Sequence, residues 1–307
     1  MKFLNALLQS CRPRQWSKNL LVYASALFSF QLIAQIWLNS TLALMSFCLI
    51  SSCIYLINDV IDINADRSHP TKKYRPIASG LVSSKEALIT AAILFLLSIR
   101  IALVVNQGLA LTIIGYTAIQ LAYCLKLKRE PLLDIFCIAA GFLLRALAGL
   151  KATELGSSPW FLLCVGLLAL FLAVEKRKAE LRVSLVRGVV TRKVLSRYSL
   201  PLLQRLESLL SSSAFMAYAL WSAGPTLQGA STSWMLLTVP FVLVGIFRYQ
   251  LLSDPEEIER RTARNPDQTT EKPEEILLGD RGVRLTLLGW IATVMVIGMG
   301  HRLGWLV

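Results

Sequence analysis

Charged residues are scarce in this sequence. Asp, Glu, Lys and Arg make up 17% of its 307 residues, whereas hydrophobic residues make up 55%. A soluble domain carries about 25% charged residues. The apolar residues fall into runs of roughly 18–22 residues, the length that a helix needs to cross a membrane. The composition therefore excludes an ordinary soluble domain and predicts an all-α protein that spans a membrane several times.

Histidine and paired cysteines are also lacking. The two histidines, His69 and His301, are too few to form a metal cluster. The six cysteines are scattered and lack the paired spacing of a zinc site or a disulfide framework. We therefore interpret them as small buried hydrophobic residues.

The hydrophobic runs predict about nine transmembrane helices within a single domain, 1–307. The predicted spans are 19–38, 41–60, 86–104, 108–125, 132–150, 159–175, 206–223, 234–251 and 285–305. Residues 1–18 mix apolar and basic side chains and are expected to lie on the membrane surface. Residues 61–85 form an Asp-rich cytoplasmic loop. Residues 252–284 form a polar cytoplasmic loop, either a partly ordered cap or a mobile segment.

The net charge of +13 follows this topology. With the N-terminus inside, the inside loops hold most of the Lys and Arg, most densely in 176–205. The outside loops hold little beyond Arg100, Lys151 and Arg302. This is the positive-inside pattern, which predicts a cytoplasmic N-terminus and an external C-terminus. The basic charge is thus explained without nucleic acid as a partner.

Four oxygen-bearing side chains stand at the end of the second run: Asn58, Asp59, Asp62 and Asp66. On a helix, Asn58, Asp62 and Asp66 fall at successive i, i+4 steps. Like charges at this spacing repel, so a positive partner is expected among them. Carboxylates suit Mg²⁺, which also binds substrate phosphates. Asp59, Asp62 and Asp66 are therefore the predicted ligands of Mg²⁺ in a diphosphate site at the membrane boundary. The plainer interpretation is a solvated, acidic helix end.

A basic loop follows these carboxylates. Its cations would neutralise phosphate oxygens that the metal leaves uncovered, although positive-inside bias also places cations here. Pro76 and Gly80 favour an ordered loop over a helix. The candidates for substrate binding in this loop are Arg67, Lys72, Lys73 and Arg75.

A second group of polar residues surrounds the fifth run. Lys126, Glu130 and Asp134 occur at i, i+4 and i+8 around the turn before it. Arg145 lies inside the run, where a lone cation is costly unless it faces a polar cavity. We expect Lys126, Asp134 and Arg145 to contribute to substrate binding.

The sixth run ends in Lys176, Arg177 and Glu180. Arg177 and Glu180 are spaced as an ordinary helix pair. Their place at the membrane boundary matches that of Asp59–Asp66 and predicts a second wall that faces the substrate phosphates. Lys18, just before the first run, is expected to reach the same cavity.

A helix that ends in Asn-Asp-x-x-Asp-x-x-x-Asp, here Asn58 to Asp66, resembles the first signature of the UbiA superfamily of intramembrane prenyltransferases. Within that superfamily the chain is most similar to the decaprenyl-phosphate phosphoribosyltransferases. The segments that carry this resemblance, in order, are 12–19, 58–80, 125–134, 141–146, 176–181 and 273–281. The resemblance covers nearly the whole chain and implies the UbiA all-helical fold.

The resemblance implies transfer of a 5-phosphoribosyl group from 5-phosphoribosyl 1-diphosphate to a polyprenyl phosphate, with Mg²⁺ as cofactor and release of diphosphate. Asn58, Asp59, Asp62 and Asp66 would form the catalytic group. The product is a precursor of lipid-linked arabinose donors for the cell envelope, and the expected location is the bacterial cytoplasmic membrane. A homo-oligomer is compatible with the sequence, since helix-packing motifs in lipid are too weak to specify an oligomeric state from one chain.

Two alternatives remain open. A polyprenyl diphosphate:aromatic acceptor prenyltransferase, of quinone, haem or chlorophyll type, would use the same Asp-rich helix. It also predicts a second Asp-x-x-x-Asp motif, where this chain has Lys176, Arg177 and Glu180. A transporter predicts charges near mid-bilayer and paired broken helices. The charges here gather instead at one membrane face, which favours the enzyme.

Overall fold

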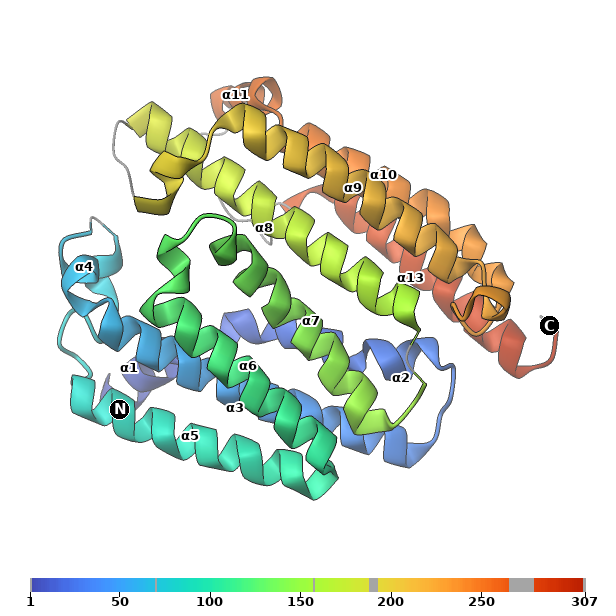
Figure 1. Cartoon of the computed structure of the whole chain (residues 1–307), viewed down its shortest axis with the longest axis horizontal. Coiled ribbons are helices and arrows are strands. Elements are labelled where there is room, and N and C mark those ends of the chain that lie inside the picture. The colour runs from blue at the N-terminus through green and yellow to red at the C-terminus, as the bar shows by residue number, and fades with distance from the viewer. Residues whose placement is uncertain (1, 70, 157, 188–192, 265–278, 306–307) are drawn as a thin grey trace. The chain divides into compact units, whose positions relative to one another are not determined.

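The computed structural model describes residues 2–69, 71–156, 158–187, 193–264 and 279–305, and the regular elements in these ranges are all helical (Figure 1). They form two compact units. The first is Met1–Lys128 with Ala140–Gly156, and the second is Arg129–Ala139 with Ser157–Val307. The predicted all-α class is confirmed. The single domain over 1–307 stays a prediction.

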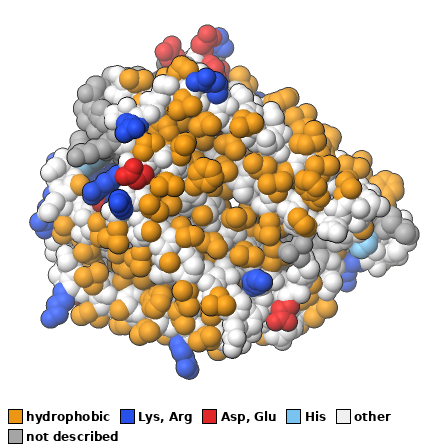
Figure 2. All heavy atoms as spheres, in the orientation of Figure 1, with side chains coloured by type: hydrophobic (Ala, Val, Ile, Leu, Met, Phe, Trp, Pro, Cys, Tyr) orange, Lys and Arg blue, Asp and Glu red, His pale blue; other side chains and the backbone are white. Residues whose placement is uncertain are grey.

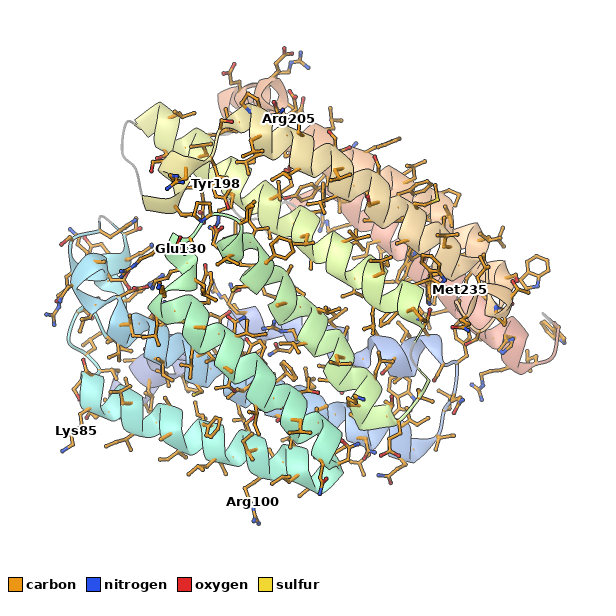
Figure 3. The ribbon with its side chains drawn as sticks, in the orientation of Figure 1. Lys85, Arg100, Glu130, Tyr198, Arg205 and Met235 are labelled. Carbon is orange, nitrogen blue, oxygen red and sulfur yellow. The ribbon has the colours of Figure 1, made fainter. Side chains whose placement is uncertain are left out.

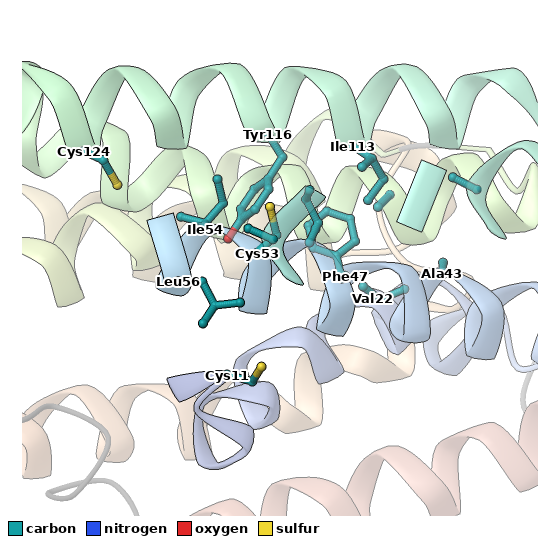
Figure 4. Packing of buried hydrophobic residues seen from close by; sticks show 14 of the residues in the cluster. Cys11, Val22, Ala43, Phe47, Cys53, Ile54, Leu56, Ile113, Tyr116 and Cys124 are labelled. Carbon is teal, nitrogen blue, oxygen red and sulfur yellow. The ribbon is translucent and has the colours of Figure 1, made fainter. Parts of the chain in front are cut away.

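The first unit is built on one long helix, α3. Its elements are α1 (Lys2–Ser10), η1 (Pro13–Tyr23), α2 (Ala24–Phe28), α3 (Ala34–Ile61), α4 (Ile63–Arg67), η2 (Lys72–Tyr74), α5 (Ser84–Val105), α6 (Gln107–Leu125), η3 (Leu127–Arg129) and most of α7 (Leu133–Thr153), where η marks a 3₁₀-helix. Helix α5 packs along α3, which α6 and η1 also contact. The buried side chains between them include Phe47, Leu56, Ile113 and Tyr116 (Figure 4).

A single residue, Asn106, connects α5 to α6. Its extended backbone turns the chain, and its side-chain oxygen accepts the backbone N–H of Leu109 at 2.8 Å, which caps α6. Its amide group donates to the carbonyl of Lys151 at 2.7 Å. Asn106 therefore ends one helix, begins the next and ties both to α7.

Helix α7 approaches η1 closely at Gly149. A Cβ atom at this position would collide with the carbonyl oxygen of Val22. Next to it, the hydroxyl of Thr153 donates to that of Ser25 at 3.3 Å. The close backbone contact therefore depends on the absence of a side chain at Gly149.

The second unit is formed by the start of α7, α8 (Pro159–Arg187), η4 (Lys193–Arg197), α9 (Leu200–Ser222), η5 (Pro225–Leu227), η6 (Ser233–Thr238), α10 (Val239–Leu252), α11 (Pro255–Arg264) and α13 (Arg281–Arg302). Helix α9 packs along α8, and α10 packs against α13. Val174, Leu195 and Leu203 form the buried centre of a cluster at the contact of α8, η4 and α9.

Seven helical segments in the described ranges are long and apolar enough to span a membrane: Ala34–Ile61, Ser84–Val105, Gln107–Leu125, Leu133–Thr153, Pro159–Leu185, Ser233–Leu252 and Arg281–Arg302. Large apolar side chains on them are exposed, including Leu96 and Val104 of α5 at 62% and 75%. Hydrophobic side chains cover much of the face in Figure 2. Such exposure suits contact with lipid, and the chain is an integral membrane protein.

Nine spans is therefore an approximate count, and one of the predicted runs needs correction. The first run, 19–38, is not one helix, because the chain leaves α2 after Phe28 and begins α3 at Ala34. Phe30 between them has a left-handed backbone, φ 55°, which interrupts a helix. The seventh run, 206–223, coincides with the helix α9, which is not among the seven because Arg205, Glu207 and several serines lower its mean hydropathy. Whether α9 spans the membrane stays a prediction.

All six cysteines are free; five are buried and Cys48 is half-buried. Helix α1 exposes Phe3, Leu4 and Leu8, and its place on the membrane surface stays a prediction. The polar loop 252–284 begins with a helix, α11, while 265–278 lie outside the described residues.

Replacing Gly149 by alanine should destabilise the first unit, because the added methyl group forces α7 away from η1. Overpacking of this kind costs about 1–3 kcal/mol. We expect the Tm in detergent to fall by about 2–4 °C for each kcal/mol. Gly115→Ala is the matched control, since nothing lies within 4 Å of its added Cβ. Equal Tm values for the two variants would contradict the close contact.

Candidate active site

The acidic residues lie at the junction of α3 and α4. Helix α3 ends at Ile61, and Asp62 leaves the α conformation with φ −90° and ψ 6°. Two hydrogen bonds nevertheless preserve the helical spacing, from the N–H of Asp62 to Asn58 and from the N–H of Asp66 to Asp62. Asp59 and Asp66 are buried, at 3% and 4% exposure. The chain thus places Asp59 and Asp66 out of water at this junction.

Three cations of the first unit pair with these three carboxylates. Arg75 bridges two of them, with Nη1 at 3.1 Å from Asp59 Oδ1 and 2.6 Å from Asp66 Oδ2. Arg12 lies 2.5 Å from the same Asp59 oxygen. Lys128 Nζ lies 2.6 Å from Asp62 Oδ1. Burial of carboxylates is costly unless they are paired, and these ion pairs satisfy that requirement.

Arg12 reaches Asp59 from a strained backbone. Its φ of 52° and ψ of 60° are left-handed, a conformation that non-glycine residues seldom adopt. The guanidinium also lies over the ring of Tyr55, 4.7 Å from its centroid. The ion pair and the cation–π contact together stabilise this geometry.

The basic loop after α4 is ordered by side-chain contacts with its own backbone. Arg67 is exposed and its Nε donates to the carbonyl of Ala78 at 3.1 Å. His69 Nδ1 accepts the backbone N–H of Thr71 at 3.3 Å. Burial and the neighbouring Lys72 lower the pKa of His69. Lys73 is exposed beside the ring of Tyr74. Among the four predicted cations in this loop, Arg75 forms ion pairs with the carboxylates of Asp59 and Asp66.

The sequence reasoning missed two of these cations. Helical spacing selected Lys126, which is exposed just after the end of α6 at Leu125 and stays a prediction. The chain then turns through η3, which brings Lys128 to Asp62. Arg12 was also missed, because it lies 47 residues from Asp59 along the chain. Lys18 is half-buried on η1.

In the second unit, Arg177 holds two carboxylates. Its Nε lies 2.5 Å from Asp134 Oδ2, and its Nη1 lies 2.6 Å from Glu180 Oε2. The side chains of Arg177 and Asp134 are both fully buried, at 0% exposure. Removing one partner of such a pair leaves an uncompensated buried charge and costs about 3–5 kcal/mol. The two predicted site residues are therefore joined to each other, with Glu180 beside them.

Tyr198 completes this network, and the sequence reasoning did not find it. Its hydroxyl donates to Asp134 Oδ1 at 2.6 Å and accepts the backbone N–H of Leu132 at 2.6 Å. Leu132 has a left-handed φ of 67°. Burial, and next the hydrogen bond to Asp134, raise the pKa of Tyr198. Tyr198 (Figure 3) thus keeps a proton at neutral pH and ties the start of α7 to η4.

A second buried group lies on the same helix, α8. Lys178 Nζ is 2.5 Å from Glu175 Oε1 and also pairs with Glu207 of α9. These ion pairs join α8 to α9. The neighbouring Lys176 is half-buried.

Arg145 lies inside the first unit at 6% exposure, surrounded by neutral partners. It donates to Asn19 Oδ1 at 2.7 Å, to the Gly141 carbonyl at 2.6 Å and to the Tyr116 hydroxyl at 3.1 Å. It also lies within 6 Å of the ring centroids of Phe47, Tyr116 and Phe142. These contacts compensate its burial and link η1, α6 and α7.

The carboxylate cluster fits Mg²⁺ by the chemistry of its donors, since Asn58, Asp59, Asp62 and Asp66 all offer hard oxygen ligands. In the described ranges, however, no three Asp, Glu, His or Cys side chains are arranged to hold a metal ion. The expected positive charge is supplied by Arg75 between Asp59 and Asp66. A metal ion at these oxygens would have to exchange with an arginine, and the predicted ligand set stays a prediction.

Comparison with known proteins gives three results. The model of the UbiA prenyltransferase family matches residues 20–265. The chain is 37% identical over 304 residues to the decaprenyl-phosphate phosphoribosyltransferase of Mycolicibacterium smegmatis, covering 95% of this chain and 92% of that protein. The corresponding protein of Corynebacterium glutamicum is 34% identical over 305 residues, covering 95% and 86%.

The fold is also similar to a solved structure, a UbiA homologue from Archaeoglobus fulgidus bound to GPP and Mg²⁺. The TM-score is 0.69 at 20% sequence identity, over 97% of this chain and 100% of that one. At this identity the likeness concerns the fold.

Replacing Tyr198 by phenylalanine should destabilise the second unit. The change leaves the N–H of Leu132 without its acceptor and takes a donor from the buried Asp134. An unsatisfied buried polar group costs about 1–3 kcal/mol, so the Tm in detergent should fall by about 2–4 °C for each kcal/mol. Tyr74→Phe is the control, because Tyr74 is 72% exposed. If both variants kept the wild-type Tm, the Tyr198 network would not be a stabilising one.

Proposed function

The chain belongs to the UbiA prenyltransferase family, and from that premise we propose that it is a phosphoribosyltransferase. It transfers 5-phosphoribose from 5-phosphoribosyl 1-diphosphate to a polyprenyl phosphate of decaprenyl type and releases diphosphate. The observation that carries this proposal is the near full-length similarity to proteins named decaprenyl-phosphate phosphoribosyltransferase.

The proposed reaction replaces one oxygen substituent of the ribose by another. A phosphate oxygen of the lipid acceptor forms a bond to C1 of the ribose, and the bond from C1 to the diphosphate breaks with its electron pair on the leaving group. A phosphate monoester is already ionised near pH 7, so the acceptor requires no dedicated general base. The difficulty is instead the approach of two anions, which cations of the protein relieve.

Asn58, Asp59, Asp62 and Asp66 are the proposed group at the leaving diphosphate. They would hold Mg²⁺, which supplies charge stabilisation for the departing phosphates when bound. The helical hydrogen bonds across the junction of α3 and α4 support this role, because they keep the four residues within about two turns of one another. One or two ions are compatible with the set.

Seven of the cations that the sequence predicts at the site have side chains that are at least partly exposed, and we propose that these bind phosphate. They are Lys18, Arg67, Lys72, Lys73, Arg75, Lys126 and Lys176. The fully buried Arg177 is assigned instead to holding Asp134 and Glu180 in place. Arg145 is assigned to linking helices of the first unit. Both would act on substrates through the groups that they position. The isoprenoid chain of the acceptor would lie among the apolar helices, in contact with lipid.

We further propose that the membrane is the bacterial cytoplasmic membrane, with the N-terminus and the active site on the cytoplasmic side and the C-terminus outside. The distribution of Lys and Arg supports this orientation. The lipid-linked phosphoribose would then serve as a precursor of arabinose donors in cell-envelope biosynthesis.

The test is a product assay with the purified protein in detergent, Mg²⁺, a polyprenyl phosphate and radiolabelled 5-phosphoribosyl 1-diphosphate. Label should enter the lipid phase, and EDTA should abolish the transfer. Asp62→Asn should lower the rate by about 10²-fold or more, the loss typical of a group that stabilises transition-state charge. Asp254→Asn is the control, since Asp254 is exposed and its side chain accepts the backbone N–H of Glu256 at the start of α11.

No label in the lipid phase, together with prenylation of an aromatic acceptor from a polyprenyl diphosphate, would refute phosphoribosyl transfer. It would identify the aromatic prenyltransferase branch of the family.

A further inference from the structure

Arg75 occupies the oxygens that the proposed Mg²⁺ would need. One nitrogen, Nη1, contacts both Asp59 and Asp66, whose carboxylates are buried. A guanidinium and a divalent cation cannot share these oxygens without bringing like charges together. Binding of a metal ion to Asp59 Oδ1 and Asp66 Oδ2 therefore requires Arg75 to move.

The structure allows Arg75 to move. Its side chain is 27% exposed, and it stands on the loop after η2, where its backbone is extended with φ −60° and ψ 142°. Arg177 provides the contrast, because it too lies between two carboxylates but has 0% exposure on the long helix α8. The arginine between two carboxylates is thus fully buried at Arg177 and accessible to solvent at Arg75.

We propose that Arg75 is an exchangeable internal cation, which neutralises Asp59 and Asp66 while the metal is absent and turns to the diphosphate of the donor when the metal binds. This inference rests on the proposed function. Without a cation, Asp59 and Asp66 would be like charges buried close together, which is unfavourable. Arg75 removes that repulsion in the free protein. After the exchange it is a cation next to the metal, and phosphate oxygens are suitable partners for a guanidinium.

The exchange has a thermodynamic consequence. Metal alone must displace Arg75 and leave it without its carboxylate partners, so metal alone should bind weakly. Metal together with the diphosphate gives Arg75 a new partner, so each ligand should raise the affinity of the other. Arg75 would therefore couple metal binding to the presence of the donor and limit binding of metal to an empty site.

The experiment uses Mn²⁺ as a spectroscopic probe for the purified full chain in detergent. Free Mn²⁺ is measured by electron paramagnetic resonance, with and without 5-phosphoribosyl 1-diphosphate. In the wild type, the donor should tighten Mn²⁺ binding by about 5–150-fold, the usual range of coupling between two sites. In Arg75→Gln, Mn²⁺ alone should bind at least about 5-fold more tightly, and the effect of the donor should fall towards none.

Two control variants separate exchange from general electrostatics. Lys85→Gln removes one charge from an exposed position that points away from the helices (Figure 3) and should match the wild type. Arg67→Gln removes a cation of the same loop whose guanidinium bonds the Ala78 carbonyl. If Arg67→Gln tightened binding of Mn²⁺ alone as much as Arg75→Gln, the exchange role would be overturned.

The outcomes distinguish the inference from the proposed function. If Mn²⁺ binds neither alone nor with the donor, the proposed metal site fails. If Mn²⁺ binds with the donor but Arg75→Gln changes neither affinity nor coupling, the metal site stands and the exchange role is refuted. Should Arg75→Gln not fold, Arg75→Lys, which keeps the charge but loses the planar fork, should show a coupling below that of the wild type. Wild-type coupling in Arg75→Lys would refute the exchange role as well.

Discussion

Two buried carboxylates at the end of α3, those of Asp59 and Asp66, share one arginine, Arg75. The arrangement of the surrounding segments depends on this pairing. Charges removed from water must be compensated nearby. Arg75 meets that demand for both carboxylates, and Arg12 adds a second contact to Asp59. The loop after α4 and the start of η1 are thereby drawn to one helix end. The strained backbone of Arg12 is a local cost of the same requirement.

The need to compensate buried charges also explains the contacts of Arg177 and Arg145, but these two residues have a different consequence for function. Arg177 is buried between Asp134 and Glu180, while Arg145 has hydroxyl, amide and carbonyl acceptors and aromatic rings around it. Both arginines are fully engaged within the fold and position the helices that carry them. The carboxylates of Asp59, Asp62 and Asp66 are paired with cations that retain some exposure. A site that must take up and release phosphates needs such exchangeable partners.

Much of this arrangement was predictable from local patterns. The runs that became α5, α6 and α8 are continuously apolar, and the Asn58–Asp66 spacing survives in the structure because i, i+4 hydrogen bonds persist across the break at Asp62. The resemblance to the UbiA superfamily, based on that motif, is confirmed by the family match. Contacts between residues that lie far apart in the sequence were not predictable in this way. Arg12 and Tyr198 lie far along the chain from Asp59 and Asp134, and no periodicity joins them.

Other differences from expectation also have local causes. The chain leaves α6 after Leu125 and turns through η3, which brings Lys128, a residue that helical spacing did not select, to Asp62. Lys126, which the spacing did select, stays a prediction. The hydropathy of 19–38 suggested one span, whereas the left-handed Phe30 divides it. Hydropathy and spacing both assume that an element continues, and they fail where the backbone leaves the helix.

The central claim is that the junction of α3 and α4 holds the metal–diphosphate group of the donor. The most direct test is an experimental structure with 5-phosphoribosyl 1-diphosphate and Mn²⁺, in which anomalous scattering locates the metal. We expect a metal bound to carboxylate oxygens of Asp59, Asp62 or Asp66, at about 2.1 Å as for Mg²⁺, with Arg75 displaced from them. A metal and diphosphate bound elsewhere, with the Arg75 ion pairs intact, would contradict it.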